Sequence, residues 1–181
     1  FGGSLGAKPL NDAIYPIILK DCDSKSICHI HSVGTNGADY LDKFRENGFE
    51  EKSENILVKG NCEVRLYIDN MDTCMAAADL VIGRAGASSL SEIEAMGKAS
   101  VLIPSPYVAE NHQYHNAMAL VNRNAARLIE EKDLTSDSLQ AMIDSLLSDT
   151  DTLLEIEKNA RQMAIIDARE RIADIIIGLA K

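Results

Sequence analysis

The sequence lacks an excess of positive charge. Its 181 residues carry 18 Lys and Arg against 28 Asp and Glu, which gives a formal net charge of -10 at pH 7 and a pI near 4.8. Nucleic acid is therefore disfavoured as a partner, because binding along a phosphate backbone needs a basic face that releases counterions. A single diphosphate is still compatible with this charge, since helix N-termini and backbone amides hold phosphate locally.

Long apolar runs are also missing. No stretch approaches the roughly 20 apolar residues of a membrane span, and the start has no basic segment followed by an apolar one. We therefore expect no membrane-spanning segment within these residues. The sequence opens with Phe1 rather than methionine, and Phe-Gly-Gly is typical of a strand that enters a glycine turn. This pattern leads us to expect native sequence upstream.

Cysteine is scarce, and its spacing matches neither a CxxC redox pair nor a zinc-ligand framework. The four residues are Cys22, Cys28, Cys62 and Cys74. With 46% hydrophobic residues, a chain of this length buries enough apolar surface for one domain without disulfide bonds. We expect reduced, structural thiols in a cytosolic protein.

The sequence does contain a regular alternation of helical and extended patterns. Strands are expected at 26–33, 79–83, 100–103 and 126–129, with extended residues at 55–68. Helices are expected at 38–47, 71–78, 88–96 and 111–122. Another helix is expected before these, from Leu10, and three more helices after them. Leu80–Ile82 and Val101–Ile103 are apolar throughout, which is typical of parallel strands buried between two helical layers. The pattern predicts an α/β fold, a doubly wound parallel sheet flanked by helices.

The C-terminal third carries apolar residues at helical spacing. Thr135 is the expected N-cap of the first of its helices. In the last helix one face is formed by Ile172, Ile175, Ile176 and Leu179. Since such a face normally packs against a core, we expect the tail to lie against the body of the domain.

Ligands of open α/β sheets bind at the carboxyl ends of strands, so the loops that follow strands are candidate sites. The first is Gly2–Ala7 (GGSLGA). Its glycines permit close backbone approach, and the helix that follows offers free amides to a phosphate. Many α/β proteins use glycine here only to turn tightly, and the string is neither GxGxxG nor a P-loop. By itself this loop does not distinguish between a phosphate-binding role and a purely structural turn.

The second loop runs from Gly83 into a helix (GRAGASSLSE). Small residues let a ligand touch the backbone, Ser88 and Ser89 offer hydroxyls, and the Glu92 carboxylate can accept two ribose hydroxyl protons. The alternative is a capping box, because Ser89 and Glu92 have the S-x-x-E spacing in which the glutamate binds a backbone amide. Taken alone, the spacing favours the capping box.

The third loop, Pro104–Asn116, contains a cluster of amide and imidazole groups that is costly to bury without partners. His112 and Gln113 could hydrogen-bond sugar hydroxyls. His112 and His115 could instead begin a metal site, but no carboxylate or cysteine pattern supports one. We therefore expect no metal.

In their order and approximate spacing, four segments resemble the MurG-type glycosyltransferases. They are GGSLGA at 2–7, YIDNM at 67–71, AADLVIGRAGASSLSEI at 77–93 and ENHQYHNA at 110–117. The resemblance covers essentially the whole chain. Members of this family transfer N-acetylglucosamine from UDP-N-acetylglucosamine to lipid I (undecaprenyl-pyrophosphoryl-N-acetylmuramoyl-pentapeptide), which gives lipid II for peptidoglycan. The resemblance implies that residues 1–181 are the C-terminal, donor-binding domain of a GT-B hexosyltransferase, with a Rossmann-like fold, and that the N-terminal acceptor domain is absent from this chain.

The resemblance also implies roles for individual residues. Ser4 corresponds to a serine that contacts the diphosphate, the backbone of Ile68 to the segment that reads the uracil edge, and Glu92 to the carboxylate that holds the ribose hydroxyls. The other donor-binding residues are expected to be Ala87, Ser88 and Ser89 at the diphosphate and sugar, and His112 and Gln113 at N-acetylglucosamine. Some members have threonine in place of Ser89 and glutamine in place of His112. This context favours the ribose role of Glu92 over the capping box.

No catalytic residue is identified in this chain. The family's glycine-rich loop with its proposed catalytic histidine, and the hydrophobic patch that meets the membrane, belong to the other domain. The resemblance implies an inverting displacement without metal or other cofactor, in a cytoplasmic parent enzyme that is peripheral on the inner face of the cell membrane. Lipid I would be bound through the N-terminal domain, and the isolated chain is expected to be inactive.

Two other functions stay open. One is the donor subunit of a two-component N-acetylglucosaminyltransferase, which a natural methionine start would favour. The other is a non-catalytic module that binds a UDP-sugar, or half of a UDP-sugar epimerase. An epimerase needs additional acid and base residues beside the sugar, and the sequence offers no convincing set.

Overall fold

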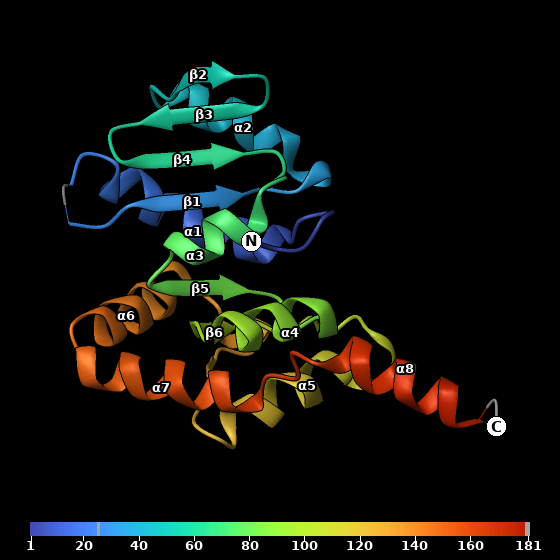
Figure 1. Ribbon diagram of the computed structural model, residues 1–181. Helices are drawn as coiled ribbons and strands as arrows, with labels where there is room; N and C mark the ends of the chain where they lie inside the picture. The colour runs from blue at the N-terminus through green and yellow to red at the C-terminus, as the bar shows by residue number, and fades with distance from the viewer. Residues whose placement is uncertain (25, 180–181) are drawn as a thin grey trace.

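The computed structural model describes residues 1–24 and 26–179. Within these residues, seven strands form the middle layer of the domain (Figure 1): β1 (His29–Ser32), β2 (Glu50–Ser53), β3 (Ile56–Lys59), β4 (Cys62–Arg65), β5 (Leu80–Gly83), β6 (Ala99–Leu102) and β7 (Arg127–Leu128). The α-helices are α1 (Lys8–Asp21), α2 (Ala38–Glu46), α3 (Met71–Ala77), α4 (Ala87–Met96), α5 (His112–Val121), α6 (Ser136–Leu147), α7 (Thr150–Met163) and α8 (Ala168–Leu179). Three short 3-10 helices are η1 (Thr35–Gly37), η2 (Ala109–Asn111) and η3 (Glu131–Asp133). The predicted elements are confirmed, with ends that differ by up to three residues.

The strands pair in two groups, in the order β1-β4-β3-β2 and β5-β6-β7. The pairs β1–β4, β5–β6 and β6–β7 are parallel. In Figure 1 the arrows of β1, β4 and β5 point in the same direction, so their carboxyl ends lie at one edge of the domain. The predicted α/β class with parallel strands between helices is confirmed.

One edge of the first group departs from the parallel pattern. β3 runs antiparallel to both β2 and β4. Only Gly60 and Asn61 connect β3 to β4, and two residues can close a hairpin but cannot make the crossover that parallel pairing requires. The extended residues predicted at 55–68 are therefore an antiparallel hairpin at the margin of the sheet.

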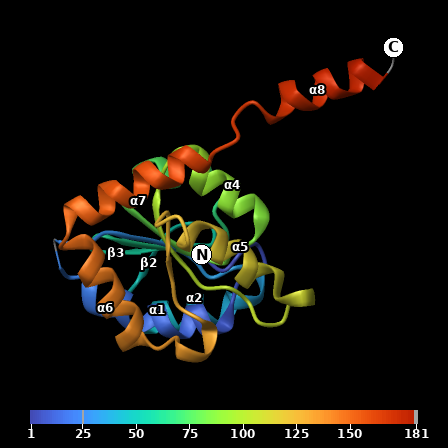
Figure 2. The same cartoon turned by 90° about the horizontal axis from the view of Figure 1, so that it is seen from below.

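Helices cover both faces of the strands, as the view from below shows (Figure 2). α1, α2 and α6 contribute to one cluster of buried side chains, and α4 and α5 to a second. β6 supplies both clusters, because Ala99 and Val101 belong to the first and Leu102 to the second. Apolar residues on both faces of this strand were expected from the sequence, and this alternation confirms them.

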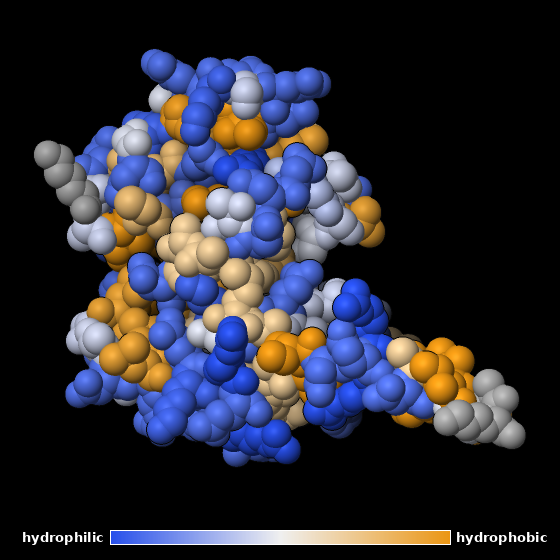
Figure 3. Space-filling model, in the orientation of Figure 1, coloured by the Kyte–Doolittle hydropathy of each residue, from blue (hydrophilic) through white to orange (hydrophobic). Residues whose placement is uncertain are grey.

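α8 does not pack as the sequence predicts. It extends away from the body in two perpendicular views (Figures 1 and 2), and no residue of Ala168–Leu179 is buried. Ile175 and Ile176 are 62% and 61% exposed. Figure 3 shows apolar side chains gathered on this helix. The prediction was wrong because the periodicity of apolar residues reports that a helix has an apolar face, not which surface covers that face.

Residues 1–24 and 26–179 contain several helices of different lengths. None of them combines the length and the apolar character that crossing a bilayer requires.

Candidate functional site

The glycine loop Gly2–Ala7 lies between the ends of two parallel strands. On one side the backbone nitrogen of Phe1 donates to the carbonyl of Ile82 in β5 at 2.7 Å. On the other side, the loop contacts the residues that follow β1: the amide of Thr35 donates to the carbonyl of Ser4 at 3.1 Å. The loop is thus fixed at the carboxyl edge of the sheet, where ligands of α/β folds bind.

Glycine is required at the point where this loop meets β1. Gly6 has a φ of +85°, and a Cβ built there would lie 2.1 Å from the carbonyl oxygen of Val33. That carbonyl also accepts a hydrogen bond from the side-chain amide of Asn11 at 2.9 Å, and the Oδ1 of Asn11 lies 3.1 Å from the Nε2 of His31. Burial lowers the pKa of His31 well below its ordinary value, so the ring is neutral and donates to Asn11. A buried chain of hydrogen bonds therefore supports the base of the loop.

Ser4 stands on the exposed side of this turn, followed by the start of α1. α1 has Ala7 at its N-cap, and no side chain caps its first turn. Its first amides are therefore available to an anion, with the exception of Pro9, which has none. Ser4 and this helix end present a hydroxyl and amides to solvent on the same side of the fold.

The second loop enters α4 without a side-chain cap. α4 begins at Ala87, with Gly86 in extended conformation at the N-cap. Ser89 is therefore the third residue of the helix and cannot be its N-cap, so the capping-box interpretation of Ser89 and Glu92 is wrong. The amides of Ala87, Ser88 and Ser89 have no partner within the helix. Free amides at the positive end of a helix dipole are able to bind an anion, which makes this helix start a candidate anion site.

Glu92 lies one turn further along α4. Spacings of three and four residues place the side chains of Ser88, Ser89 and Glu92 along one strip of the helix. Ser88 and Glu92 are exposed and Ser89 is half-buried. The strip therefore offers hydroxyl donors near the anion site and a free carboxylate about one helical turn away, roughly 5 Å along the axis.

Ile68 lies three residues beyond the end of β4. Its side chain is only 5% exposed, whereas the preceding Tyr67 is 47% exposed. The buried side chain anchors this segment, so its backbone is held at the edge just before α3 begins at Met71. A held backbone of this kind can present fixed donors and acceptors to a planar base.

The third loop has an unusual backbone at its entry into α5. Glu110 and Asn111 have φ values of 52° and 51°, a conformation that non-glycine residues adopt rarely and that costs energy. His112 is the first residue of α5, is exposed, and places its Nδ1 3.0 Å from the carbonyl of Ala109. Gln113 accepts a hydrogen bond from the amide of Ser105 at 2.9 Å. Its carbonyl oxygen thus holds the loop, and its NH₂ group is free to donate.

Two hollows border the start of α1. One, of about 380 Å³, lies between the start of α1 and the loops after β6 and β7, and is lined by Pro9, Pro104, Pro106, Tyr107, Asn111, Tyr114, Glu130, Glu131 and Lys132. The other, of about 230 Å³, lies between α1 and the segment after β1, and is lined by Leu5, Gly6, Ala7, Lys8, Asn11, Val33, Asn36, Gly37, Asp39 and Tyr40. Of these two hollows, the second is lined in part by the glycine loop.

With the geometry established, similarity to known proteins decides the family. Residues 1–174 match the model of the glycosyltransferase family 28 C-terminal domain. The chain belongs to this family. Relatives and a solved structure of the MurG type confirm the resemblance predicted from the sequence.

Sequence identity to individual relatives supports the assignment to family 28. The chain is 38% identical over 184 aligned residues to the UDP-N-acetylglucosamine--N-acetylmuramyl-(pentapeptide) pyrophosphoryl-undecaprenol N-acetylglucosamine transferase 1 of Bacillus cereus. The alignment includes 100% of this chain and 47% of that protein. The chain is 41% identical over 181 residues to the transferase of the same name from Acetivibrio thermocellus, with the same coverage. The chain thus spans about half the length of the relatives it matches.

A solved structure shows the same fold. The crystal structure of Acinetobacter baumannii MurG superposes with a TM-score of 0.78 at 27% identity, over 98% of this chain and 48% of that one. The assignment of the family 28 domain to the C-terminal half of a GT-B fold therefore rests on the fold as well as on the sequence.

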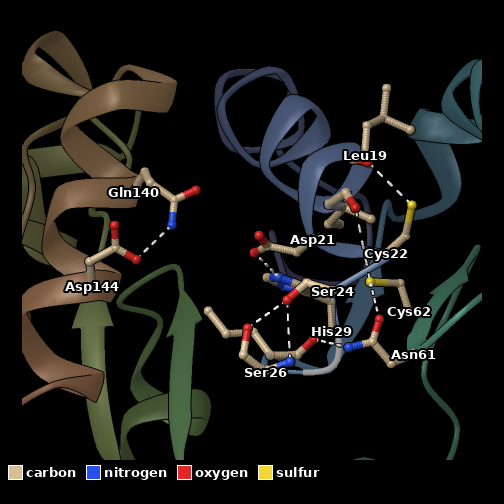
Figure 4. Close-up of polar contacts among 12 residues, drawn as sticks. Leu19, Asp21, Cys22, Ser24, Ser26, His29, Asn61, Cys62, Gln140 and Asp144 are labelled. Carbon is tan, nitrogen blue, oxygen red and sulfur yellow. Dashed lines mark hydrogen bonds and ion pairs between the residues drawn. The ribbon is translucent and has the colours of Figure 1, made fainter.

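The opposite end of the strands has its own polar cluster (Figure 4). His29 at the start of β1 lies 2.9 Å from the carboxylate of Asp21, and both side chains are largely buried. The thiols of Cys22 and Cys62 contact backbone carbonyls of α1 nearby. All four cysteines are free, and only Cys28 is exposed. Within residues 1–24 and 26–179, no three His, Cys, Asp or Glu side chains group as a metal site would require.

Several residues of the family 28 site were not predicted from the sequence. Asn116 donates to the carbonyl of Ala85 at 3.3 Å and so ties α5 to the second loop. Arg84 makes a buried ion pair with Glu131, 47 positions later. The sequence signal for Arg84 is a charged residue directly after an apolar run, but the partners of Arg84 and Asn116 are visible only once the fold is known.

Proposed function

We propose that residues 1–181 are the C-terminal, UDP-N-acetylglucosamine-binding domain of an inverting N-acetylglucosaminyltransferase whose acceptor is lipid I. The observation that carries this proposal is the uncapped start of α4, with free amides at Ala87–Ser89 and the Glu92 carboxylate one turn later. An anion site and a carboxylate at this spacing suit the diphosphate and the ribose of one nucleotide. The names of the relatives, which are transferases of N-acetylglucosamine to a lipid-linked muramyl pentapeptide, support the sugar and the acceptor.

In this proposal each predicted donor residue has a distinct task. Ser4 and the amides of Ala87, Ser88 and Ser89 hold the diphosphate, and the backbone at Ile68 reads uracil. Glu92 accepts the ribose hydroxyls, while His112 and Gln113 contact the sugar. The free NH₂ group of Gln113 and the exposed ring of His112 support the last assignment.

Catalysis follows from charge development on the leaving group. When an acceptor hydroxyl displaces UDP at the anomeric carbon, negative charge grows on the diphosphate, and amides already oriented toward it stabilise that charge without rearrangement. The base that removes the acceptor proton would come from the N-terminal acceptor domain. The proposed product is lipid II for peptidoglycan, made by a peripheral enzyme at the cytoplasmic face of the membrane.

The exposed face of α8 supports a two-domain parent. Monomeric proteins rarely leave a helix with four exposed isoleucines and a leucine uncovered, and the relatives are about twice as long as this chain. Its apolar residues from Ile172 to Leu179 are therefore consistent with a domain that has a neighbour in the full-length enzyme.

Calorimetric titration with UDP-N-acetylglucosamine, UDP-glucose, UDP and ADP tests the proposal. We expect binding of the uridine nucleotides, with little or none of ADP, because the backbone at Ile68 selects the base. The same preparation should transfer no sugar to a lipid I analogue. Equal binding of ADP would contradict the assignment to uridine nucleotides, and transfer by these residues alone would contradict a catalytic base in another domain.

A further inference from the structure

A buried ion pair stands at the carboxyl edge directly beside the second loop. Arg84 directly follows β5 as the second residue of that loop, and Glu131 opens η3 after β7. The guanidinium of Arg84 donates to the carboxylate of Glu131 through Nη2 and to the carbonyl of Ile103 through Nη1, the latter at 3.1 Å. The Arg84 and Glu131 side chains are only 11% and 9% exposed.

This pair joins the ends of three neighbouring strands. Arg84 belongs to the end of β5, Ile103 directly follows β6, and Glu131 lies three residues beyond β7. The backbone of Arg84 continues into residues 85–89, which comprise the end of the second loop and the first residues of α4. We name residues 85–89 the donor loop. Two further hydrogen bonds act on the same region, from Asn116 to the carbonyl of Ala85 and from the amide of Ser105 to Gln113. Of these contacts, only the one with Glu131 involves opposite charges.

The ion pair of Glu131 is more buried than the ion pair formed by the neighbouring Glu130 and Lys132. Glu130 is paired with Lys132 at 3.1 Å, and these side chains are 40% and 69% exposed, so water screens their attraction. The Arg84–Glu131 pair is shielded from water, and removing one partner leaves the other charge buried without compensation. Without Glu131, Arg84 would have to move toward solvent or another acceptor, and its backbone would carry the donor loop with it.

We propose that Glu131 is a positioning residue for nucleotide binding: through Arg84 it holds the donor loop so that its amides face the diphosphate. This inference rests on the proposed function. It assigns Glu131 no contact with the ligand. Because the uridine half of the ligand is held by Ile68 and Glu92, outside the donor loop, loss of the pair affects the diphosphate selectively.

The test compares Glu131→Gln with Glu130→Gln, a neutralisation of the adjacent, exposed carboxylate. Affinities for UDP and for uridine are measured by calorimetry, and backbone order parameters of residues 85–89 are measured by NMR without ligand. In Glu131→Gln we expect UDP affinity to fall about tenfold while uridine affinity is unchanged. Order parameters in the donor loop should fall from about 0.85 toward 0.6. Glu130→Gln should match the wild type in all three measurements.

A double variant separates positioning from stability. Replacing both Arg84 and Glu131 with methionine removes the pair without leaving a buried charge, so the melting temperature should recover relative to Glu131→Gln. UDP affinity should stay low. Equal losses for UDP and uridine, or a recovery of UDP affinity together with stability, would overturn the proposal.

A failure of the proposed function can be distinguished from a failure of the inference about Glu131. If the wild type bound neither UDP nor uridine, the donor assignment would fail, and the ligand-free order parameters would still decide whether Glu131 holds the donor loop. Unchanged order parameters in Glu131→Gln would overturn the inference whatever the ligand.

Discussion

Replacing Glu92 with glutamine is expected to weaken UDP binding by about 10- to 100-fold, which corresponds to about 1.4–2.8 kcal/mol. The carboxylate can accept both ribose hydroxyl protons, and a hydrogen bond to a charged acceptor is worth more than one to a neutral amide. Glutamine has nearly the same shape but offers one neutral acceptor oxygen. Calorimetric titration of the variant with UDP measures the loss.

The matched control for this prediction is Glu94→Gln. Glu94 lies on the same helix two positions later, is half-buried, and faces away from the strip formed by Ser88, Ser89 and Glu92. UDP affinity should be unchanged in this control, and both variants should have wild-type circular dichroism. Equal affinities of Glu92→Gln and the wild type would remove Glu92 from the nucleotide site.

Replacing Gly6 with alanine is expected to destabilise the domain by roughly 3–5 kcal/mol. The residue has a φ of +85°, and the new methyl group would meet the Val33 carbonyl oxygen at 2.1 Å. Val33 is held from the other side by Asn11, so the carbonyl cannot retreat without breaking a buried hydrogen bond. Urea denaturation, with a lowered midpoint and an unchanged m-value, measures the effect.

Gly3→Ala separates the collision from the backbone strain. Gly3 has the same φ of +85°, but a Cβ built there has no atom within 4 Å. Its replacement should cost only the left-handed conformation, about 1–2 kcal/mol. If Gly6→Ala and Gly3→Ala lowered the stability equally, the close contact between the glycine loop and β1 would not be a determinant of this fold.

The sequence predicted the layered α/β fold because its signals are local. The apolar runs at β5 and β6, the helical spacing in α4 and α5, and the Thr135 cap all depend on residues close together in the chain. Thr135 indeed caps α6, in a reciprocal pair of hydrogen bonds with Ser138. Features that depend on contacts between distant parts of the chain were not predicted correctly. The periodicity of α8 predicted a packed helix, yet nothing in the local pattern specifies a covering surface.

The site was predicted in part, for a related reason. The three loops were found because the ends of parallel strands must meet at one edge, which follows from topology alone. The choice between a capping box and a ligand carboxylate at Glu92 needed the helix boundary, which sequence patterns place only to within a few residues. The pairing of Arg84 with Glu131 could not be predicted, because it spans three strands of the sheet.

The donor-binding assignment is tested most directly by following the backbone amides of the ¹⁵N-labelled chain while UDP is added. We predict that the largest chemical-shift changes occur at Ser4, Ile68, residues 87–89 and Glu92, all at the carboxyl edge of the sheet. The amides around Asp21 and His29, at the opposite end of β1, should not change. Saturable shifts clustered at that opposite end, or none at Ile68 and 87–89, would contradict the assignment.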